Sequence, residues 1–300
     1  MRRVHWWGIP LLMAVVVAAT FEKSSVAAEP LELKDKDRVV MLGATFIERE
    51  GQFGYLETAF TTAWPERKFT FRNLGWSGDT VWADSRGIFD APQVGYQRMI
   101  ALVKELKPTV IIFGYGLNES YAGDAGLEPF VKQFEKLCDD VKPTGARFAF
   151  VTPTRLEKPP APLPDASKQN VMLEKYVAAI RQLAARREAP VIDLFALEPA
   201  ARNLTENGMH FGPNGYAAIA QGVRQQQKLA VRGLTSAQEE QIRQRIVEKN
   251  MLFFHRWRPQ NITYLTGFRK HEQGNNAVEI AQFDPLVEQI EVKIDELKKP

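Results

Sequence analysis

Residues 39–48 read VVMLGATFIE, and this stretch decides the fold. Its first four residues, 39–42, form an unbroken apolar run, which is typical of a strand covered on both faces of a sheet. Gly43 ends the run, and residues 44–48 are expected to form its exit turn. Four later segments share this apolar or β-branched character and are predicted strands: Phe69–Asn73, Thr109–Phe113, Arg147–Val151 and Pro190–Leu194.

Amphipathic stretches alternate with these runs. They predict helices near Tyr55–Trp64, Val94–Lys107, Leu127–Val141, Asn170–Arg187 and Gly215–Val231. Alternation of strands and helices favours a parallel sheet with helices on both faces. We therefore expect an α/β protein, a three-layer α/β/α sandwich around a parallel sheet of about five strands, in a domain spanning residues 37–231.

The first residues are typical of a secretory signal peptide, predicted to cover residues 1–28. A basic start at Arg2-Arg3 precedes an apolar stretch over residues 9–19 and a small-residue cleavage site at residues 26–28. Because the apolar stretch is short for a membrane span, we expect cleavage, no stable span afterwards, and a periplasmic or extracellular protein. An uncleaved anchor is the alternative interpretation.

Composition narrows the possible partners. A net charge of +3, spread along 300 residues, does not indicate a nucleic-acid-binding surface. Cys138 is the only cysteine, so no internal disulfide can form, and its apolar neighbours at helical spacing predict a buried, inert thiol. The histidines and glutamates are too scattered to suggest a metal site. Composition leaves the oligomeric state open.

Residues 232–300 differ in character from the preceding domain and are predicted to be a helical and irregular C-terminal extension. A capping box of Ser236 and Glu239 starts a helix that is expected to end near His255. A polar and aromatic segment follows over residues 256–264, with a turn at residues 274–276 and a last helix over residues 285–297. The Trp- and Arg-containing segment is expected either to bind sugars or carboxylates over a crevice or to form a packing surface.

Three further segments stand at strand ends or before a helix. Residues 73–80 read NLGWSGDT, residues 114–119 read GYGLNE, and residues 206–211 read ENGMHF. Together with residues 39–48 they resemble, in order, the four sequence blocks of the SGNH (GDSL-type) hydrolases. The resemblance covers roughly residues 37–231. It implies hydrolysis of an acyl ester by acyl transfer, with a small-molecule or carbohydrate ester as substrate and without a cofactor.

The resemblance also implies a role for each matched residue. Thr45 stands at the position of the nucleophile, and His210 at that of the general base. The backbone N–H groups of Gly75 and Thr45 and the side-chain amide of Asn118 would form the oxyanion hole. Ser77, in the same turn as Gly75, is interpreted as a turn residue.

Two of the expected catalytic positions depart from the family pattern. Thr45 replaces serine, and its methyl group restricts χ1. The alternative to Thr45 as the nucleophile is that its hydroxyl only caps the following helix. Asn207 replaces the aspartate, and this exchange lowers turnover about 10⁴-fold in a serine protease. Glu206 or a backbone carbonyl could orient His210 instead. The competing hypothesis is therefore a weak or inactive module that binds a glycan or a protein partner.

Two neighbouring stretches have open interpretations. Residues 48–50, Glu-Arg-Glu, are interpreted as a solvated helix start. The loop over residues 153–165 contains five prolines and follows the fourth predicted strand. Because loops at the carboxyl ends of parallel strands border the binding crevice, this loop either lines the substrate site or is an ordinary exposed loop.

Overall fold

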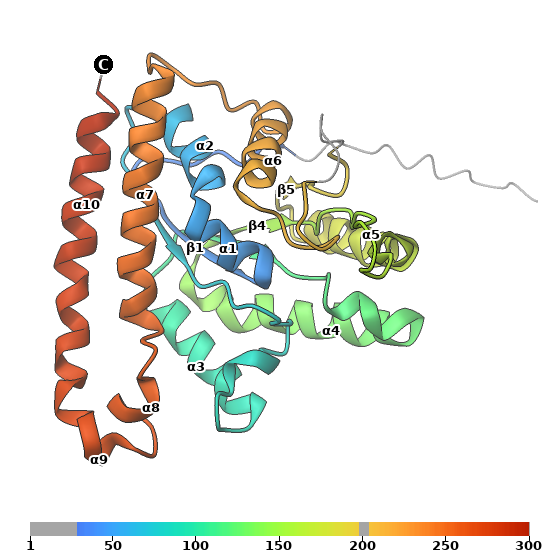
Figure 1. The fold of residues 1–300 in the computed structure, drawn as a ribbon, viewed down its shortest axis with the longest axis horizontal. Helices are drawn as coiled ribbons and strands as arrows, with labels where there is room; N and C mark the ends of the chain where they lie inside the picture. The colour runs from blue at the N-terminus through green and yellow to red at the C-terminus, as the bar shows by residue number, and fades with distance from the viewer. Residues whose placement is uncertain (1–28, 198–203, 300) are drawn as a thin grey trace, which may run out of the picture.

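The computed structural model describes residues 29–197 and 204–299, and the predicted signal peptide lies outside them (Figure 1). Within these two ranges, no helix is both long and apolar enough to cross a membrane.

A five-stranded parallel sheet forms the centre of the molecule. Its strands are β1 (Arg38–Gly43), β2 (Thr70–Asn73), β3 (Val110–Gly114), β4 (Arg147–Val151) and β5 (Val191–Ile192). Their order in the sheet is β2-β1-β3-β4-β5, and every neighbouring pair is parallel. All five predicted strands are confirmed, although β5 is shorter than the predicted Pro190–Leu194.

Helices cover both faces of the sheet, which confirms the predicted sandwich. The α-helices are α1 (Thr45–Phe53), α2 (Tyr55–Ala63), α3 (Pro92–Glu105), α4 (Gly123–Val141), α5 (Asn170–Arg186), α6 (Pro213–Gln226), α7 (Ser236–Trp257), α8 (Ile262–Leu265), α9 (Lys270–Gln273) and α10 (Phe283–Leu297). The 3₁₀ helices are η1 (Asp84–Arg86), η2 (Glu119–Ala122), η3 (Lys142–Thr144), η4 (Ala166–Gln169) and η5 (Gly274–Gln282). Helices α1, α2 and α6 pack on one face, beneath Val39 and Met41, and helices α3, α4 and α5 pack on the other, beneath Val40 and Leu42 (Figure 1). Alternate residues of β1 thus enter two separate cores.

Helix α1 begins at Thr45, within the predicted exit turn and three residues before the helix start interpreted at residues 48–50. Gly43 and Gly114 are paired at the ends of β1 and β3, and Ile47 of α1 packs against both. A Cβ on Gly43 would lie 2.5 Å from the Gly114 carbonyl oxygen, and one on Gly114 would lie 2.6 Å from Cγ1 of Ile47. The two glycines therefore let α1 start against the carboxyl edge of the sheet.

The C-terminal extension packs on the sandwich. Helix α7 contacts α1, α2 and β2, and α10 packs along α7 (Figure 1). Lys249 of α7 is buried, and its ammonium forms an ion pair with the buried carboxylate of Glu57 in α2. The capping box at the start of α7 lies one residue earlier than predicted. It joins Thr235 and Gln238, which bond each other's backbone N–H groups at 3.2 and 3.0 Å.

Two smaller predictions concern single positions. Cys138 lies in α4 and is fully buried, as predicted, and burial raises the pKa of its thiol to about 12. The turn predicted at residues 274–276 is instead the first part of the 3₁₀ helix η5.

Candidate active site

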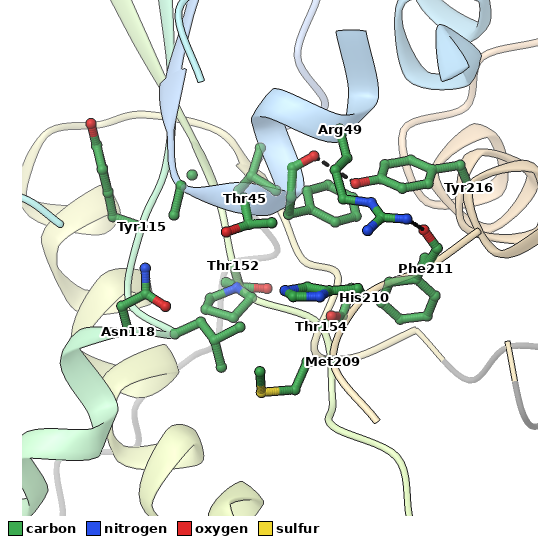
Figure 2. A pocket seen from close by; sticks show the side chains of 16 residues that line it. Thr45, Arg49, Tyr115, Asn118, Thr152, Thr154, Met209, His210, Phe211 and Tyr216 are labelled. Carbon is green, nitrogen blue, oxygen red and sulfur yellow. Dashed lines mark hydrogen bonds between the residues drawn. The ribbon is translucent and has the colours of Figure 1, made fainter. Parts of the chain in front are cut away.

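A pocket opens at the carboxyl edge of the sheet, where β1, β3 and β4 end. Its lining is Ala44, Thr45, Phe46, Arg49, Gly114, Tyr115, Leu117, Asn118, Val151, Thr152, Pro153, Thr154, Met209, His210, Phe211 and Tyr216 (Figure 2). Thr45, Asn118 and His210, which lie far apart in the sequence, therefore share one pocket. Gly75, Asn207 and Glu206 are not among its lining residues.

Thr45 is the first residue of α1 and does not cap it. The N-cap position is Ala44, which makes no side-chain capping bond. The Thr45 hydroxyl instead accepts a hydrogen bond of 3.1 Å from the backbone N–H of Gly78. Since the oxygen acts as an acceptor in this bond, the hydroxyl proton is available for transfer to another group. The interpretation of Thr45 as a helix cap is wrong.

The turn after β2 places Gly78, rather than Gly75, beside Thr45. The N–H of Gly75 donates to Oδ1 of Asn73 at 2.8 Å, and a Cβ on Gly75 would lie 2.2 Å from the backbone nitrogen of Glu48. Gly75 thus lets the turn pack closely on α1. Gly78 has a φ of +72°, which favours glycine. The N–H of Gly78 is thus directed at the Thr45 hydroxyl, whereas that of Gly75 is bonded to Asn73.

Buried polar residues hold this turn against the segment after β3. Nδ2 of Asn118 donates to the backbone oxygen of Asp79 at 2.7 Å. The Asp79 carboxylate is fully buried and accepts hydrogen bonds from Nε of Arg86 at 2.7 Å and from the Tyr115 hydroxyl at 3.1 Å. Glu119 adds a second link, since it accepts the N–H groups of Val81 and Gly116, both at 2.9 Å. Burial raises the pKa of Glu119 to about 7. The sequence analysis identified no role for Asp79 or Arg86.

The orientation of His210 is set by Asn207. Oδ1 of Asn207 accepts the backbone N–H groups of His210 at 2.9 Å and of Met209 at 3.2 Å. These two bonds fix the side-chain amide, so that Nδ2 is the atom that lies 3.2 Å from Nδ1 of His210. An amide nitrogen only donates, and Nδ1 must therefore be the acceptor. The neutral imidazole then carries its proton on Nε2, the nitrogen that remains for the pocket.

Glu206 faces Arg49 rather than the imidazole ring. Its carboxylate forms an ion pair of 2.8 Å with Nη2 of Arg49, which also donates to the Phe211 backbone oxygen at 3.0 Å. Among the described residues, Glu206 makes no hydrogen bond to the His210 ring. Burial, and secondly the positive charge of Arg49, lower the pKa of His210, while the charge of Glu206 acts in the opposite direction.

The proline-containing loop after β4 borders the pocket and supports the segment that carries His210. Pro153 and Thr154 line the pocket. Further along the loop, the Glu157 carboxylate accepts the N–H of Thr205 at 2.9 Å, and the Glu157 N–H donates to the Gly208 oxygen at 2.8 Å. The supporting role of Glu157 was not predicted, because its partners lie about 50 residues further along the chain.

The C-terminal extension reaches the turn that carries Gly78. The guanidinium of Arg258 stacks over the Trp76 ring at 3.5 Å from its centroid, and the Trp257 ring meets Trp76 edge-on at 5.8 Å. Nη1 of Arg258 also lies 3.2 Å from Oε2 of Glu48 in α1. Trp76, Trp257 and Arg258 lie beside the pocket without lining it. Of the two expectations for this segment, the contacts agree with a packing surface.

Comparisons with known proteins identify the family. The model of the GDSL-like lipase/acylhydrolase family matches residues 48–218, which is more than half of the chain. The chain therefore belongs to the GDSL-like lipase/acylhydrolase family, as the sequence blocks predicted. The matched region begins three residues after Thr45. No curated protein sequence matches the chain.

Solved structures share the fold at low sequence identity. The acetylxylan esterase Axe2 from Geobacillus stearothermophilus has a TM-score of 0.51 and 17% identity, over 68% of this chain and 100% of that chain. A gut microbial diltiazem-metabolizing enzyme, BT4096, has a TM-score of 0.53 and 18% identity, over 68% of this chain and 50% of that chain. The chain thus matches about half the length of BT4096. At these identities the likeness shows the fold alone.

Proposed function

We propose that this protein is an ester hydrolase that transfers an acyl group to Thr45. The observation that carries the proposal is the position of the Thr45 hydroxyl, which accepts the Gly78 N–H in the pocket that Asn118 and His210 also line. In the proposed reaction the N–H groups of Gly78 and Thr45 and Nδ2 of Asn118 stabilise the oxyanion.

The reaction has two acyl-transfer steps. Oγ1 of Thr45 bonds to the acyl carbon while its proton moves to Nε2 of His210. The ester C–O bond then breaks, and the leaving alcohol takes that proton. Water attacks the acyl-threonine, again giving its proton to His210, and the Thr45 oxygen is protonated as the acid leaves.

The contact between Asn207 and His210 slows this chemistry. It favours the tautomer with the proton on Nε2, whereas a base must present Nε2 without a proton. We therefore expect low turnover in the wild-type protein. The same contact favours a second candidate function, a binding module that retains the pocket without catalysis.

An acyl ester of a carbohydrate is the first substrate class to test, because Axe2 is an acetylxylan esterase.

We also propose that the protein acts after export, on the basis of the basic, apolar and small-residue pattern of residues 1–28. Amino-terminal sequencing of the protein from a periplasmic or secreted fraction would test this; an intact N-terminus would contradict it.

The activity is tested with residues 29–300 and 4-nitrophenyl acetate. We expect slow hydrolysis above the spontaneous rate, which Thr45→Ala and His210→Ala abolish. We expect Asn207→Asp to increase kcat, by up to about 10⁴-fold. A carboxylate accepts a hydrogen bond from Nδ1–H, and this favours the tautomer in which Nε2 carries no proton. The aspartate retains an oxygen for the N–H groups of Met209 and His210.

The outcomes separate the two candidate functions. Thr45→Ala with wild-type activity would show that Thr45 is not the nucleophile. No activity in either the wild type or Asn207→Asp, together with glycan binding that His210→Ala weakens, would identify a binding module. Acylation of Thr45, detected by mass spectrometry of peptides, would support the hydrolase directly.

A further inference from the structure

Among the residues that line the pocket, Arg49 is the one whose side chain carries a charge that does not change with pH near neutrality. The other 15 lining residues include neither an aspartate, a glutamate nor a lysine. Arg49 lies four residues after Thr45 on α1, and residues at this spacing share one face of a helix. Figure 2 shows its guanidinium between the Tyr216 and His210 side chains, with its hydrogen bond to the Phe211 carbonyl oxygen dashed.

The guanidinium retains unused hydrogen-bond donors. Both of its hydrogen bonds within the described residues, to Glu206 and to the Phe211 oxygen, come from Nη2. Nε is buried and has no partner among the described residues. The Arg49 side chain is 21% exposed, whereas that of Glu206 is 58% exposed. Glu206 therefore contacts the guanidinium from the solvent side.

We propose that Arg49 binds a carboxylate carried by the substrate, so that the preferred substrates are esters with a free acid group. The proposal rests on the proposed function. A guanidinium presents several donors in one plane and suits a carboxylate. Four residues, or about 6 Å along the helix axis, separate the backbone positions of Thr45 and Arg49. This spacing suits a carboxylate a few bonds from the ester carbonyl.

The partner of Arg49 allows a test in which two substitutions have opposite effects. Arg49→Gln removes the charge that attracts the carboxylate. Glu206→Gln removes a carboxylate that competes for the guanidinium and repels the substrate, while the new amide retains an oxygen that can accept from Nη2. If Arg49 only anchors the segment carrying His210, both substitutions weaken that anchor and should have the same effect.

The experiment compares a 4-nitrophenyl hemisuccinate with 4-nitrophenyl acetate in each variant. We expect wild-type kcat/KM to favour the hemisuccinate about tenfold or more. The ratio should fall to about one in Arg49→Gln, be partly kept in Arg49→Lys and rise in Glu206→Gln. O-acetylmandelate and its amide test the same preference with the carboxylate on the alcohol side. Ratios near one for both pairs in the wild type, or equal changes in Arg49→Gln and Glu206→Gln, would overturn the proposal.

A binding measurement separates this inference from the proposed function. Calorimetry with succinate should detect binding to the wild type, tighter binding to Glu206→Gln and none to Arg49→Gln. If the protein hydrolyses none of the esters, the proposed function fails and the succinate titrations alone decide the role of Arg49. Equal succinate affinities in the three proteins would overturn the inference even in an active enzyme.

Discussion

The protonation of the His210 ring depends on burial and on the charges of Arg49 and Glu206, and its tautomer depends on Asn207. Asn207 donates to Nδ1 of His210 and sets the tautomer. Arg49 lowers the pKa of His210 and Glu206 raises it, whereas burial lowers it most. The neutral ring is therefore favoured at pH 7, and it is the form that a general base needs. In the reaction that we propose, the tautomer of His210, rather than its charge, is therefore what limits it as a base.

The pH dependence of His210 can be predicted from these directions. Its NMR titration midpoint should lie below 6.5, the ordinary value for histidine, so that base-dependent activity is lost only as the pH falls through this lower value. Arg49→Gln should raise the midpoint and Glu206→Gln should lower it. The His210→Ala spectrum assigns the resonance. Midpoints that move together in the two variants would contradict the assignment of these charges.

Several contacts at the residue scale could not be predicted from the sequence. The turn over residues 73–80 contains two glycines, and only the backbone geometry shows that Gly75 is hydrogen-bonded to Asn73 while Gly78 faces Thr45. Likewise, Glu206 is adjacent to Asn207 in the sequence, yet its carboxylate pairs with Arg49, 157 residues away. The resemblance indicated segments that line one pocket, but it could not choose between neighbouring residues.

At the scale of elements, apolar runs predicted the strands well because both faces of a parallel sheet are covered. At α1, the sequence indicated a helix start at residues 48–50 but not that Glu50 is buried. Glu50, interpreted as part of a solvated helix start, is buried and accepts the N–H groups of Leu56 and Glu57 at 2.7 and 3.1 Å, at the start of α2. Burial raises the pKa of Glu50 to about 8. The polarity of such a residue cannot distinguish a buried cap from a solvated side chain.

The contact between the end of α7 and the turn carrying Gly78 predicts that Arg258 positions Gly78, which we propose as an oxyanion donor. Arg258→Ala should lower kcat by about tenfold to 10²-fold with little change in KM, because the stack that holds Trp76 is lost. Arg258→Lys should not restore kcat, since an ammonium does not stack as a planar group does. Steady-state kinetics with the aryl ester measures both constants.

Arg256 provides a matched control for this prediction. Its side chain is 25% exposed, as is that of Arg258, and it pairs with Asp284 of α10 instead of contacting Trp76. Arg256→Ala should leave kcat close to that of the wild type. Equal losses in Arg256→Ala and Arg258→Ala would show a general destabilisation of the extension rather than positioning of Gly78.

At the scale of the whole molecule, the extension and the sandwich share a buried ion pair. Lys249 bonds Glu57, and Nδ2 of Asn250 donates to the same carboxylate at 3.1 Å. Lys249→Met should lower the free energy of unfolding by about 3–5 kcal/mol, because it leaves the Glu57 charge buried without its ionic partner. Urea denaturation measures this change.

The double variant tests the cause of the loss. Adding Glu57→Gln to Lys249→Met removes the stranded charge and keeps an oxygen for Asn250, so at least half of the lost stability should return. If the two losses simply add, the ion pair does not account for the effect. A single unfolding transition in the wild type would agree with an extension that unfolds together with the sandwich.

The position of Lys249 also affects whether a strand of another chain can pair with the edge of the sheet. Strand β2 lies at the edge of the sheet. The backbone N–H groups of Thr70, its first residue, and of Leu74, the residue after its end, donate hydrogen bonds to the β1 side. Successive residues of a strand direct their backbone groups to opposite sides, so the carbonyl oxygen of Phe71 points away from β1. Nζ of Lys249 donates a hydrogen bond of 3.3 Å to this oxygen. An incomplete chain that ended before α7 would leave this strand edge open to pairing with other chains, the first step of aggregation. In the complete chain α7 covers this edge, so the extension disfavours self-association as well as packing on the turn that carries Gly78.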